Sequence, residues 1–180
     1  MIISEKLTSR EPGFSLIELM VSAGVGAIIL TAVILSFICC TRSFAAIGNY
    51  IDLNRVSQNA LDQMSRDIRQ ASSLQSFATN QLVFLDSNSN QLTFAWSPLT
   101  SQLTRSSGGA TDVLLKNCDY LSFDISQRNP VTDGAFGFYT ASNNPAVCKL
   151  VSVSWRCSRT IFGEKMNTES VQTAKIVLRN

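Results

Sequence analysis

The chain has 180 residues, which is enough for one globular domain together with a membrane segment. Its formal net charge of +2 is small and evenly spread along the chain, so the sequence does not predict a nucleic-acid surface. It has no histidine and no paired or ligand-spaced carboxylates, and we therefore expect no catalytic residues, no metal site and no cofactor.

An uncharged apolar run extends from Leu19 to Cys40. As an α-helix it would be about 33 Å long, which matches a hydrocarbon core about 30 Å thick. A single span in lipid must satisfy its own backbone hydrogen bonds, and only a helix does so. A cleaved secretory signal is the alternative, but it would have a shorter apolar core that ends in small residues, whereas this run ends in FICC. We therefore predict a membrane-spanning helix.

Glu18 directly precedes this run, and apolar residues also lie on its N-terminal side. An ionisable side chain in such a setting costs free energy unless it lies at the membrane interface or finds a partner. If the chain is an uncleaved anchor, Glu18 is better interpreted as a residue that lies at the inner edge of the bilayer. A functional role for Glu18 requires a cation nearby.

The segment from Gly13 to Glu18, which reads GFSLIE, resembles the processing site of the type IV pilin family. The resemblance implies that residues 1–13 are a leader peptide and that prepilin peptidase cuts between Gly13 and Phe14. It further implies that Phe14 becomes N-methylated and that Glu18 takes part in assembly. Residues 14–40 would then form the transmembrane and assembly helix.

Cleavage would supply the cation that Glu18 needs. The new amine on Phe14 would have a reference pKa of about 7.7–8.0. Phe14 and Glu18 are four residues apart on one helix, so the pair could close within a subunit, or an axial offset could join Glu18 of one chain to Phe14 of the next. The resemblance favours the second arrangement. A paired carboxylate is tolerable in an apolar bundle, so this charge would fix the register of assembly more than its stability.

Two features depart from the family pattern. The family usually has a basic residue directly before the glycine, whereas this leader has Glu11 and Pro12 there, and Arg10 is displaced. The mid-span proline that bends the helix of many major pilins is also missing. That difference predicts a straighter helix and fits a minor pilin or pseudopilin at least as well as a major pilin.

The helical pattern continues beyond the membrane, because no proline occurs between Cys40 and Pro98 and the apolar residues keep a helical spacing. These apolar residues are Phe44, Ile47, Ile51, Leu61, Met64, Ile68 and Ala71. Charged residues surround the later ones, which is typical of a helix that packs by one face on a sheet. We therefore predict a helix over residues 41–77.

Short alternating runs follow, divided by turn residues. Residues 81–85 and 91–96 predict a hairpin with a five-residue polar connection. Further strands are expected at 113–115, 120–125, 136–139, 150–156 and 174–178, with loops at 106–110, 127–134 and 142–145. The predicted fold class is α+β: a long N-terminal helix, membrane-spanning in its first half, packs by its C-terminal half on an antiparallel β-sheet formed by residues 78–180.

This order of helix and sheet is similar to that of pilins and pseudopilins in general. More narrowly, residues 61–71 and 177–180 resemble the J-type minor pseudopilins of type II secretion and their minor-pilin relatives.

Five cysteines show no CxxC spacing that would indicate zinc or redox chemistry. Cys39 and Cys40 end the apolar run, and we interpret them first as apolar side chains. Cys148 and Cys157 flank one predicted strand and would be too far apart for a disulfide, which needs a Cα separation of about 5.5–6 Å. A bridge from Cys118 to either of them remains open, as do three free thiols.

We predict a structural subunit, a minor pilin or pseudopilin of a type IV pilus or type II secretion pseudopilus. It would cross the inner membrane once, with its C-terminal domain outside the cytoplasm, and then enter the filament. The resemblance implies three partners: prepilin peptidase, other pilin or pseudopilin subunits bound through the N-terminal helix, and the inner-membrane assembly platform. The alternative is a permanently anchored extracytoplasmic binding module, in which Glu18 is only interfacial. An anchored hydrolase lacks a nucleophile–base pair to support it.

Overall fold

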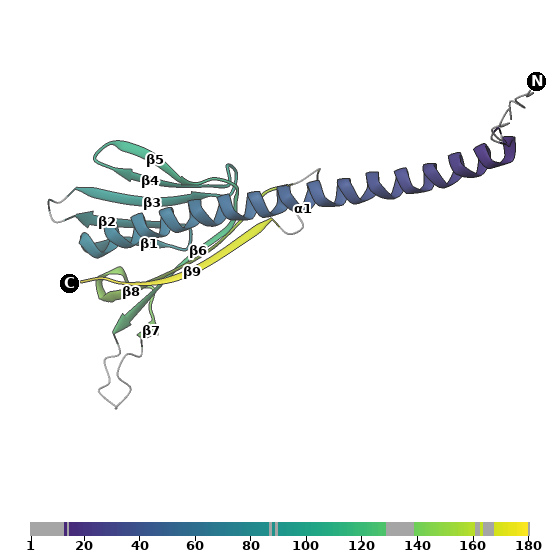
Figure 1. Ribbon diagram of the computed structural model, residues 1–180. Helices are drawn as coiled ribbons and strands as arrows, with labels where there is room; N and C mark the ends of the chain where they lie inside the picture. Colours follow the sequence, from purple (N-terminus) through teal and green to yellow (C-terminus); the bar gives the residue numbers. More distant parts are fainter. Residues whose placement is uncertain are drawn as a thin grey trace, which may run out of the picture. The chain divides into compact units, whose positions relative to one another are not determined.

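The computed structural model describes residues 13, 15–86, 88, 90–128, 139–160, 163 and 168–179. Within these ranges the chain forms one long helix, α1 (Leu16–Gln70), then nine strands and a short 3-10 helix, η1 (Pro145–Val147) (Figure 1). The chain divides between Ser43 and Phe44 into two compact units.

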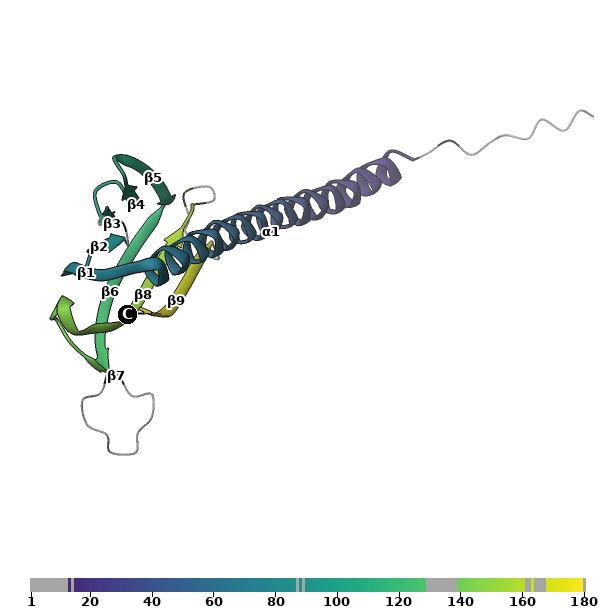
Figure 2. The ribbon, with the colours of Figure 1, turned by 90° about the vertical axis from the view of Figure 1, so that its left-hand side faces the viewer.

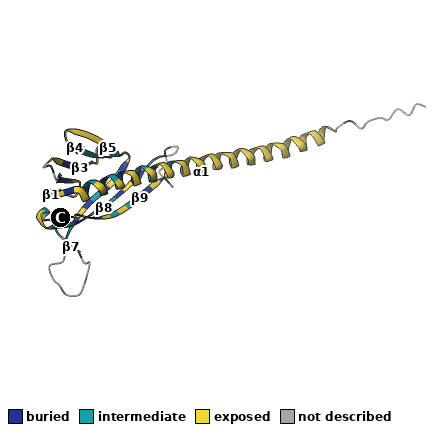
Figure 3. Ribbon diagram, turned by 60° about the vertical axis from the view of Figure 1, so that its left-hand side comes forward, coloured by how far each residue is buried: buried dark blue, intermediate teal, exposed yellow. Residues whose placement is uncertain are grey.

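The first unit contains the apolar part of α1. This helix is long and apolar enough to cross a membrane, and none of its most apolar stretch is buried. Figure 3 shows this part of α1 as exposed along its length. Four hydroxyl side chains on it donate hydrogen bonds to carbonyl oxygens three or four residues earlier, which satisfies them within the helix. These bonds run from Ser22 to Leu19, Thr31 to Ala27, Thr41 to Ile38 and Ser43 to Cys39.

In the second unit, one face of α1 is buried. The buried residues recur every three or four positions, as a helix packed on a core requires. They are Leu53, Ser57, Ala60, Met64 and Ile68. The predicted packing of Met64 and Ile68 on a sheet is therefore confirmed.

The helix ends at Gln70, so the prediction that it continues to residue 77 was wrong. Residues Ala71–Ala78 form strand β1. Two register shifts in the pairing of β1 with β2 each insert one extra residue. Ala71, Leu74 and Phe77 therefore face the core at intervals of three, instead of the usual two of a strand. That spacing imitates a helical pattern and explains the error.

The first sheet contains five antiparallel strands in the order β1-β2-β3-β4-β5. They are β1 (Ala71–Ala78), β2 (Gln81–Asp86), β3 (Gln91–Ser97), β4 (Gln102–Ser107) and β5 (Ala110–Leu115). The predicted hairpin is confirmed, because β2 pairs with β3 and Leu85 lies opposite Gln91. The sequence does not predict β4, because that segment has few apolar residues.

The predicted loop at residues 106–110 is shorter in the structure. Ser107 pairs with Ala110, so only a two-residue turn joins β4 to β5. Gly108 and Gly109 both have positive φ, at 59° and 85°, which is the conformation that a type I′ hairpin turn requires.

The second sheet has four antiparallel strands in the order β7-β6-β8-β9. They are β6 (Cys118–Arg128), β7 (Tyr139–Ala141), β8 (Cys148–Ser158) and β9 (Glu169–Val177). Three of these strands are longer than predicted, and β6 extends into the expected loop at 127–134. Most of the strand expected at 136–139 lies outside the described residues. The loop expected at 142–145 is irregular until η1 begins at Pro145.

The core of the second unit lies where α1 meets both sheets (Figure 2). Its largest fully buried side chains come from all three parts, and Phe84 and Phe94 contact each other edge to face with ring centroids 6.3 Å apart. The predicted α+β class, with a long N-terminal helix packed on antiparallel β-structure, is confirmed. The described residues form two sheets, however, where the sequence predicts one.

Candidate functional site

Glu18 lies in the first turn of α1, and its side chain is exposed. The residue before the helix, Ser15, accepts a hydrogen bond at its Oγ from the backbone N–H of Glu18, at 3.3 Å. Ser15 is therefore the N-cap of α1, and Glu18 occupies the third helical position, where the helix dipole favours a carboxylate. Our sequence analysis missed Ser15, although the Ser-x-x-Glu spacing before an apolar run is the signature of a capping box.

The cleavage site predicted from the sequence is described only in part. Gly13 is exposed and lies outside the helix, while Phe14 falls outside the described residues. A Cβ atom added at Gly13 would meet no other atom within 4 Å. Packing within this chain therefore does not require glycine at position 13, and any such requirement would come from the enzyme that reads the site.

No ion pair involves Glu18 within the part of the chain that the structure describes. The next charged residue along α1 is Arg42, 24 positions later, which corresponds to about 36 Å of helix. That distance is far beyond the reach of a direct ion pair. A countercharge for Glu18 must therefore come from the N-terminal side of the helix or from another molecule.

The apolar part of α1 is exposed along its length in the part of the chain that the structure describes. Its large apolar side chains are between 44% and 79% exposed, from Leu16 to Ile38. A continuous apolar surface of this length is unusual for a protein in water and is typical of a surface that faces lipid or other subunits. This part of α1 is therefore a candidate membrane and assembly surface.

A second exposed apolar surface follows it on α1, in the other compact unit. Phe44, Ile47 and Ile51 are 75%, 56% and 62% exposed, and their spacing places them on one side of the helix. We call these three residues the juxtamembrane stripe. Helical geometry places them on a different side of α1 from the buried residues Leu53–Ile68, and they do not contact the core of the second unit.

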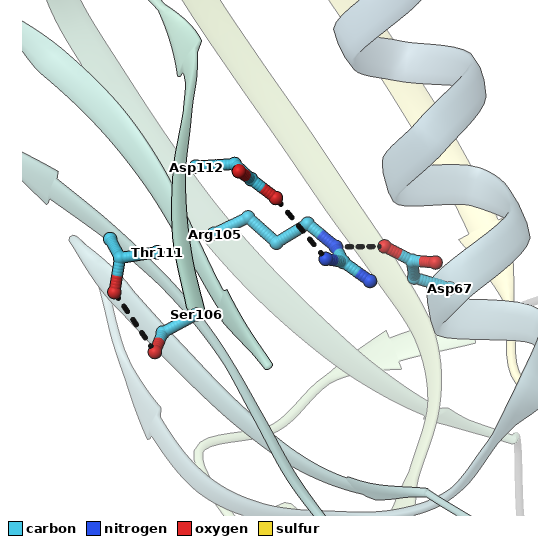
Figure 4. A network of polar contacts seen from close by, with 5 residues as sticks. All are labelled: Asp67, Arg105, Ser106, Thr111 and Asp112. Atoms are coloured by element: carbon cyan, nitrogen blue, oxygen red, sulfur yellow. Dashed lines mark hydrogen bonds and ion pairs between the residues drawn. The ribbon is translucent and has the colours of Figure 1, made fainter. Parts of the chain in front are cut away.

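Polar contacts attach α1 to both sheets. Asp67 on α1 accepts a hydrogen bond from Nε of Arg105 on β4 at 2.6 Å, and Asp112 on β5 lies 3.7 Å from the same guanidinium (Figure 4). On the second sheet, the indole N–H of Trp155 donates to the buried Ser57 hydroxyl at 3.3 Å. These contacts hold the helix firmly on its domain.

Two further contacts join the helix to the second sheet. Arg159, just after β8, forms an ion pair with Asp52 at 2.7 Å. The amide of Gln172 on β9 donates to the side-chain oxygen of Asn54 at 2.9 Å. No motif in the sequence indicates these pairs, because their partners are more than 100 residues apart.

The structure places two of the three cysteines of the sheet domain opposite each other and the third apart from them. Cys118 on β6 is the direct pairing partner of Cys157 on β8, and both side chains are buried. Cys148 pairs instead with Gln127, toward the other end of β6. Of the two bridges that the sequence leaves open, only the one between Cys118 and Cys157 is geometrically possible.

The two paired thiols interact with each other. Their mutual hydrogen bond, assisted by burial, raises the pKa of Cys118, while the same hydrogen bond lowers the pKa of Cys157. Burial raises the pKa of Cys148 to about 11. Cys39 and Cys40 are exposed on the apolar part of α1.

Comparison with known protein families gives one match, to the prokaryotic N-terminal methylation motif, over residues 8–34. The match includes Gly13, Phe14 and Glu18 and most of the apolar run. The motif marks a type IV pilin-like protein, and the α+β architecture agrees with it. No curated protein matches the chain.

The match to this motif supports the coarser part of the sequence predictions. Proteins with the motif are processed by prepilin peptidase, assemble with pilin-like subunits and are typically structural proteins, not enzymes. The apolar helix and the motif together indicate a membrane-anchored prepilin that is later assembled outside the cell.

Proposed function

We propose that this chain is a minor pilin or pseudopilin, a structural subunit of a type IV pilus or type II secretion pseudopilus. Prepilin peptidase would cut between Gly13 and Phe14, and Phe14 would become N-methylated. The observation that carries the proposal is the match to the methylation motif on a helix whose apolar side chains are exposed among the described residues.

The electrostatics of the helix end support a dependence of assembly on cleavage. Glu18 has no ion-pair partner among the described residues, and removal of residues 1–13 creates an amine four positions before it. In a bundle of apolar helices, this amine on Phe14 of one subunit would neutralise Glu18 of its neighbour. The pair would define the axial register, because a shifted neighbour would leave both charges unpaired.

The juxtamembrane stripe supports an assembly contact that continues beyond the bilayer. Phe44, Ile47 and Ile51 follow the apolar run by only one to three helical turns and are exposed to a similar degree. We infer that they pack on the helix of an adjacent subunit in the filament. This contact would cover apolar surface that otherwise faces water.

Among the possible machines, we propose a J-type minor pseudopilin of type II secretion. Support comes from the resemblance of residues 61–71 and 177–180 to those proteins. In the structure Met64, Ile68 and Leu178 of these segments are buried in the core. Disruption of the gene should then abolish export of folded enzymes, whereas loss of surface pili with normal export would contradict this assignment.

Processing can be tested by mass spectrometry of the full chain isolated from membranes. We expect an N-terminus at Phe14 that carries one added methyl group. A strain without prepilin peptidase is the control, and it should yield the chain with its leader. Recovery of the uncleaved chain from cells with an active peptidase would contradict the proposal.

A further inference from the structure

Cys118 and Cys157 lie in a position that suits a covalent bond. They are direct partners in the antiparallel pairing of β6 with β8, and directly opposed residues in such a pair have Cα atoms about 4.5–5.5 Å apart. Disulfides occur at Cα separations of about 4.4–6.8 Å. The Cys118 thiol donates to the carbonyl of Tyr120 at 3.3 Å, and the two thiols lie close enough to shift each other's pKa. Bond formation would therefore need side-chain rotation and little movement of the backbone.

The backbone around this pair is held on both sides. The N–H of Cys118 donates to the carbonyl of Ser101 at 2.9 Å, and the carbonyl of Cys118 accepts from the Trp96 indole at 3.1 Å. Beside Cys157, the N–H of Ser158 donates to the carbonyl of Asn117 at 3.0 Å. These bonds fix the register that brings the two sulfur atoms together.

Cys148 cannot compete for either partner. It is nine residues from Cys157 along β8, which corresponds to about 30 Å of extended chain. Its thiol donates to the carbonyl of Leu150, at 3.7 Å. The pairing of β6 with β8 places it near the opposite end of β6 from Cys118.

We propose that Cys118 and Cys157 form a disulfide when the domain folds outside the cytoplasm, an inference that rests on the proposed orientation in the membrane. The two thiols would lose two protons and two electrons as one S–S bond forms. The acceptor would be the disulfide of a thiol–disulfide oxidoreductase, which is reduced to two thiols. The reaction proceeds through a mixed disulfide that the second cysteine resolves.

Burial determines when this reaction can occur. Cys118 and Cys157 are almost fully inaccessible in the folded domain, so a protein oxidant must reach them before β6 and β8 close. Once formed, the bond would be protected from reductants by the same packing. It would join the two longest strands beside Ser57, whose side chain interacts with Cys157 and with Trp155. The attachment of α1 to the second sheet would thereby be reinforced.

Peptide mapping can test the bond directly. Lys and Arg positions place Cys118, Cys148 and Cys157 on three separate tryptic peptides, namely 117–128, 129–149 and 157–159. Cells should be lysed in N-ethylmaleimide, so that free thiols are blocked before the full chain is purified and digested without reductant. We expect peptide 117–128 linked to 157–159, with Cys148 alkylated. Alkylation of both Cys118 and Cys157, or a link to Cys148, would overturn the proposal.

A refolding experiment distinguishes two ways in which the proposal could fail. Either the geometric argument for pairing Cys118 with Cys157 is wrong, or the proposed orientation of the chain in the membrane is wrong. The reduced full chain, refolded in detergent with a glutathione redox buffer, should form the same linked peptide. If the link forms in this buffer but not in cells, the proposal of a disulfide in cells fails and the orientation is at fault. If it forms in neither, the geometric argument fails, while the proposed pilin function stands.

Thermal unfolding of the oxidised full chain provides a second measurement. A sample reduced while unfolded and then refolded in reductant should have a midpoint about 10 °C lower, because the bond closes a loop of about 40 residues. Cys118→Ala should have a lower midpoint that no longer responds to reductant. Cys148→Ala is the matched control and should keep the full response. A wild-type midpoint that this reduction does not change would contradict the proposal.

Discussion

The carboxylate of Glu18 has modest support from its own helix and no countercharge among the residues that the structure describes. Its place in the first turn of α1 contributes about 0.3–1 kcal/mol through the helix dipole. Burial of a carboxylate without a partner costs several kcal/mol. The dipole is therefore too weak to compensate for transfer into an apolar bundle, and on the proposed pathway stable assembly would require a cation such as the amine of a processed Phe14.

Replacement of Glu18 by glutamine should impair assembly into filaments without affecting insertion into the membrane. Glu18→Gln keeps the size of the side chain and removes its charge, so membrane insertion and cleavage should continue. Incorporation into filaments should fall at least about tenfold, because the neighbouring amine would lose its partner. The measurement is the fraction of the subunit in sheared filaments relative to membranes.

Glu11→Gln is the matched control for that experiment. It makes the same chemical change in the leader, which the mature subunit would no longer contain. We expect normal incorporation for this variant. If Glu18→Gln also assembled normally, Glu18 would be only an interfacial residue and the proposed pairing with Phe14 would be wrong.

Ser57 is a buried hydroxyl with a structural role on the same helix. Its hydroxyl accepts from the Trp155 indole, so Ser57→Ala would leave a buried N–H unpaired. We expect a loss of about 1–3 kcal/mol in the free energy of unfolding, measured by urea denaturation of the full chain in detergent. Ser65→Ala, at a half-buried position of α1, should change that free energy by less than about 0.5 kcal/mol.

At the scale of elements, α1 combines two surfaces with different partners. Residues from Leu53 to Ile68 supply a buried face that packs on both sheets, while the juxtamembrane stripe has no partner in the second unit. Stability of the domain should therefore depend on the first surface. Assembly should depend on the second.

Two substitutions of the same residue type can distinguish these surfaces. Ile68 is 0% exposed and Ile47 is 56% exposed. Ile68→Ala should lower the free energy of unfolding by about 2–5 kcal/mol, because it creates a cavity in the core. Ile47→Ala should change it by less than about 0.5 kcal/mol yet reduce incorporation into filaments. Unfolding in urea and filament recovery are the two measurements.

The result for Ile47→Ala tests the inferred contact. Normal recovery of filaments with this variant would show that the juxtamembrane stripe is not an assembly surface. Lower stability of Ile47→Ala would instead indicate that the residue packs within its own domain.

At the scale of the whole molecule, the sequence predicts the helix, the hairpin and the α+β class, because these follow from local patterns. The motif at Gly13 and Glu18 is equally local. The C-terminal end of α1 could not be predicted, because the bulges of β1 place the core-facing residues of that strand at intervals of three, as in a helix. The division into two sheets depends on long-range pairing after Asn117, a residue with positive φ, and no periodicity in the sequence encodes it.

Long-range strand pairing also explains why the sequence alone does not determine which cysteines lie close enough to form a disulfide. The spacing of Cys118, Cys148 and Cys157 allows two bridges from Cys118, and only the register of β6 with β8 selects one of them. In the same way, Phe44 and Met64 are both large apolar residues of α1. One is exposed and the other is buried, because the sheets cover only the later part of the helix.

The hydroxyl groups on the apolar part of α1 have a consequence for extraction from the membrane. Ser22, Thr31, Thr41 and Ser43 each donate to a carbonyl of their own helix. On the proposed pathway, lipid is exchanged for the helices of other subunits, and none of these four groups has to change its partner. The exchange is then nearly neutral along most of the apolar run, and its direction depends on the groups that gain a partner, namely the carboxylate of Glu18 and the juxtamembrane stripe.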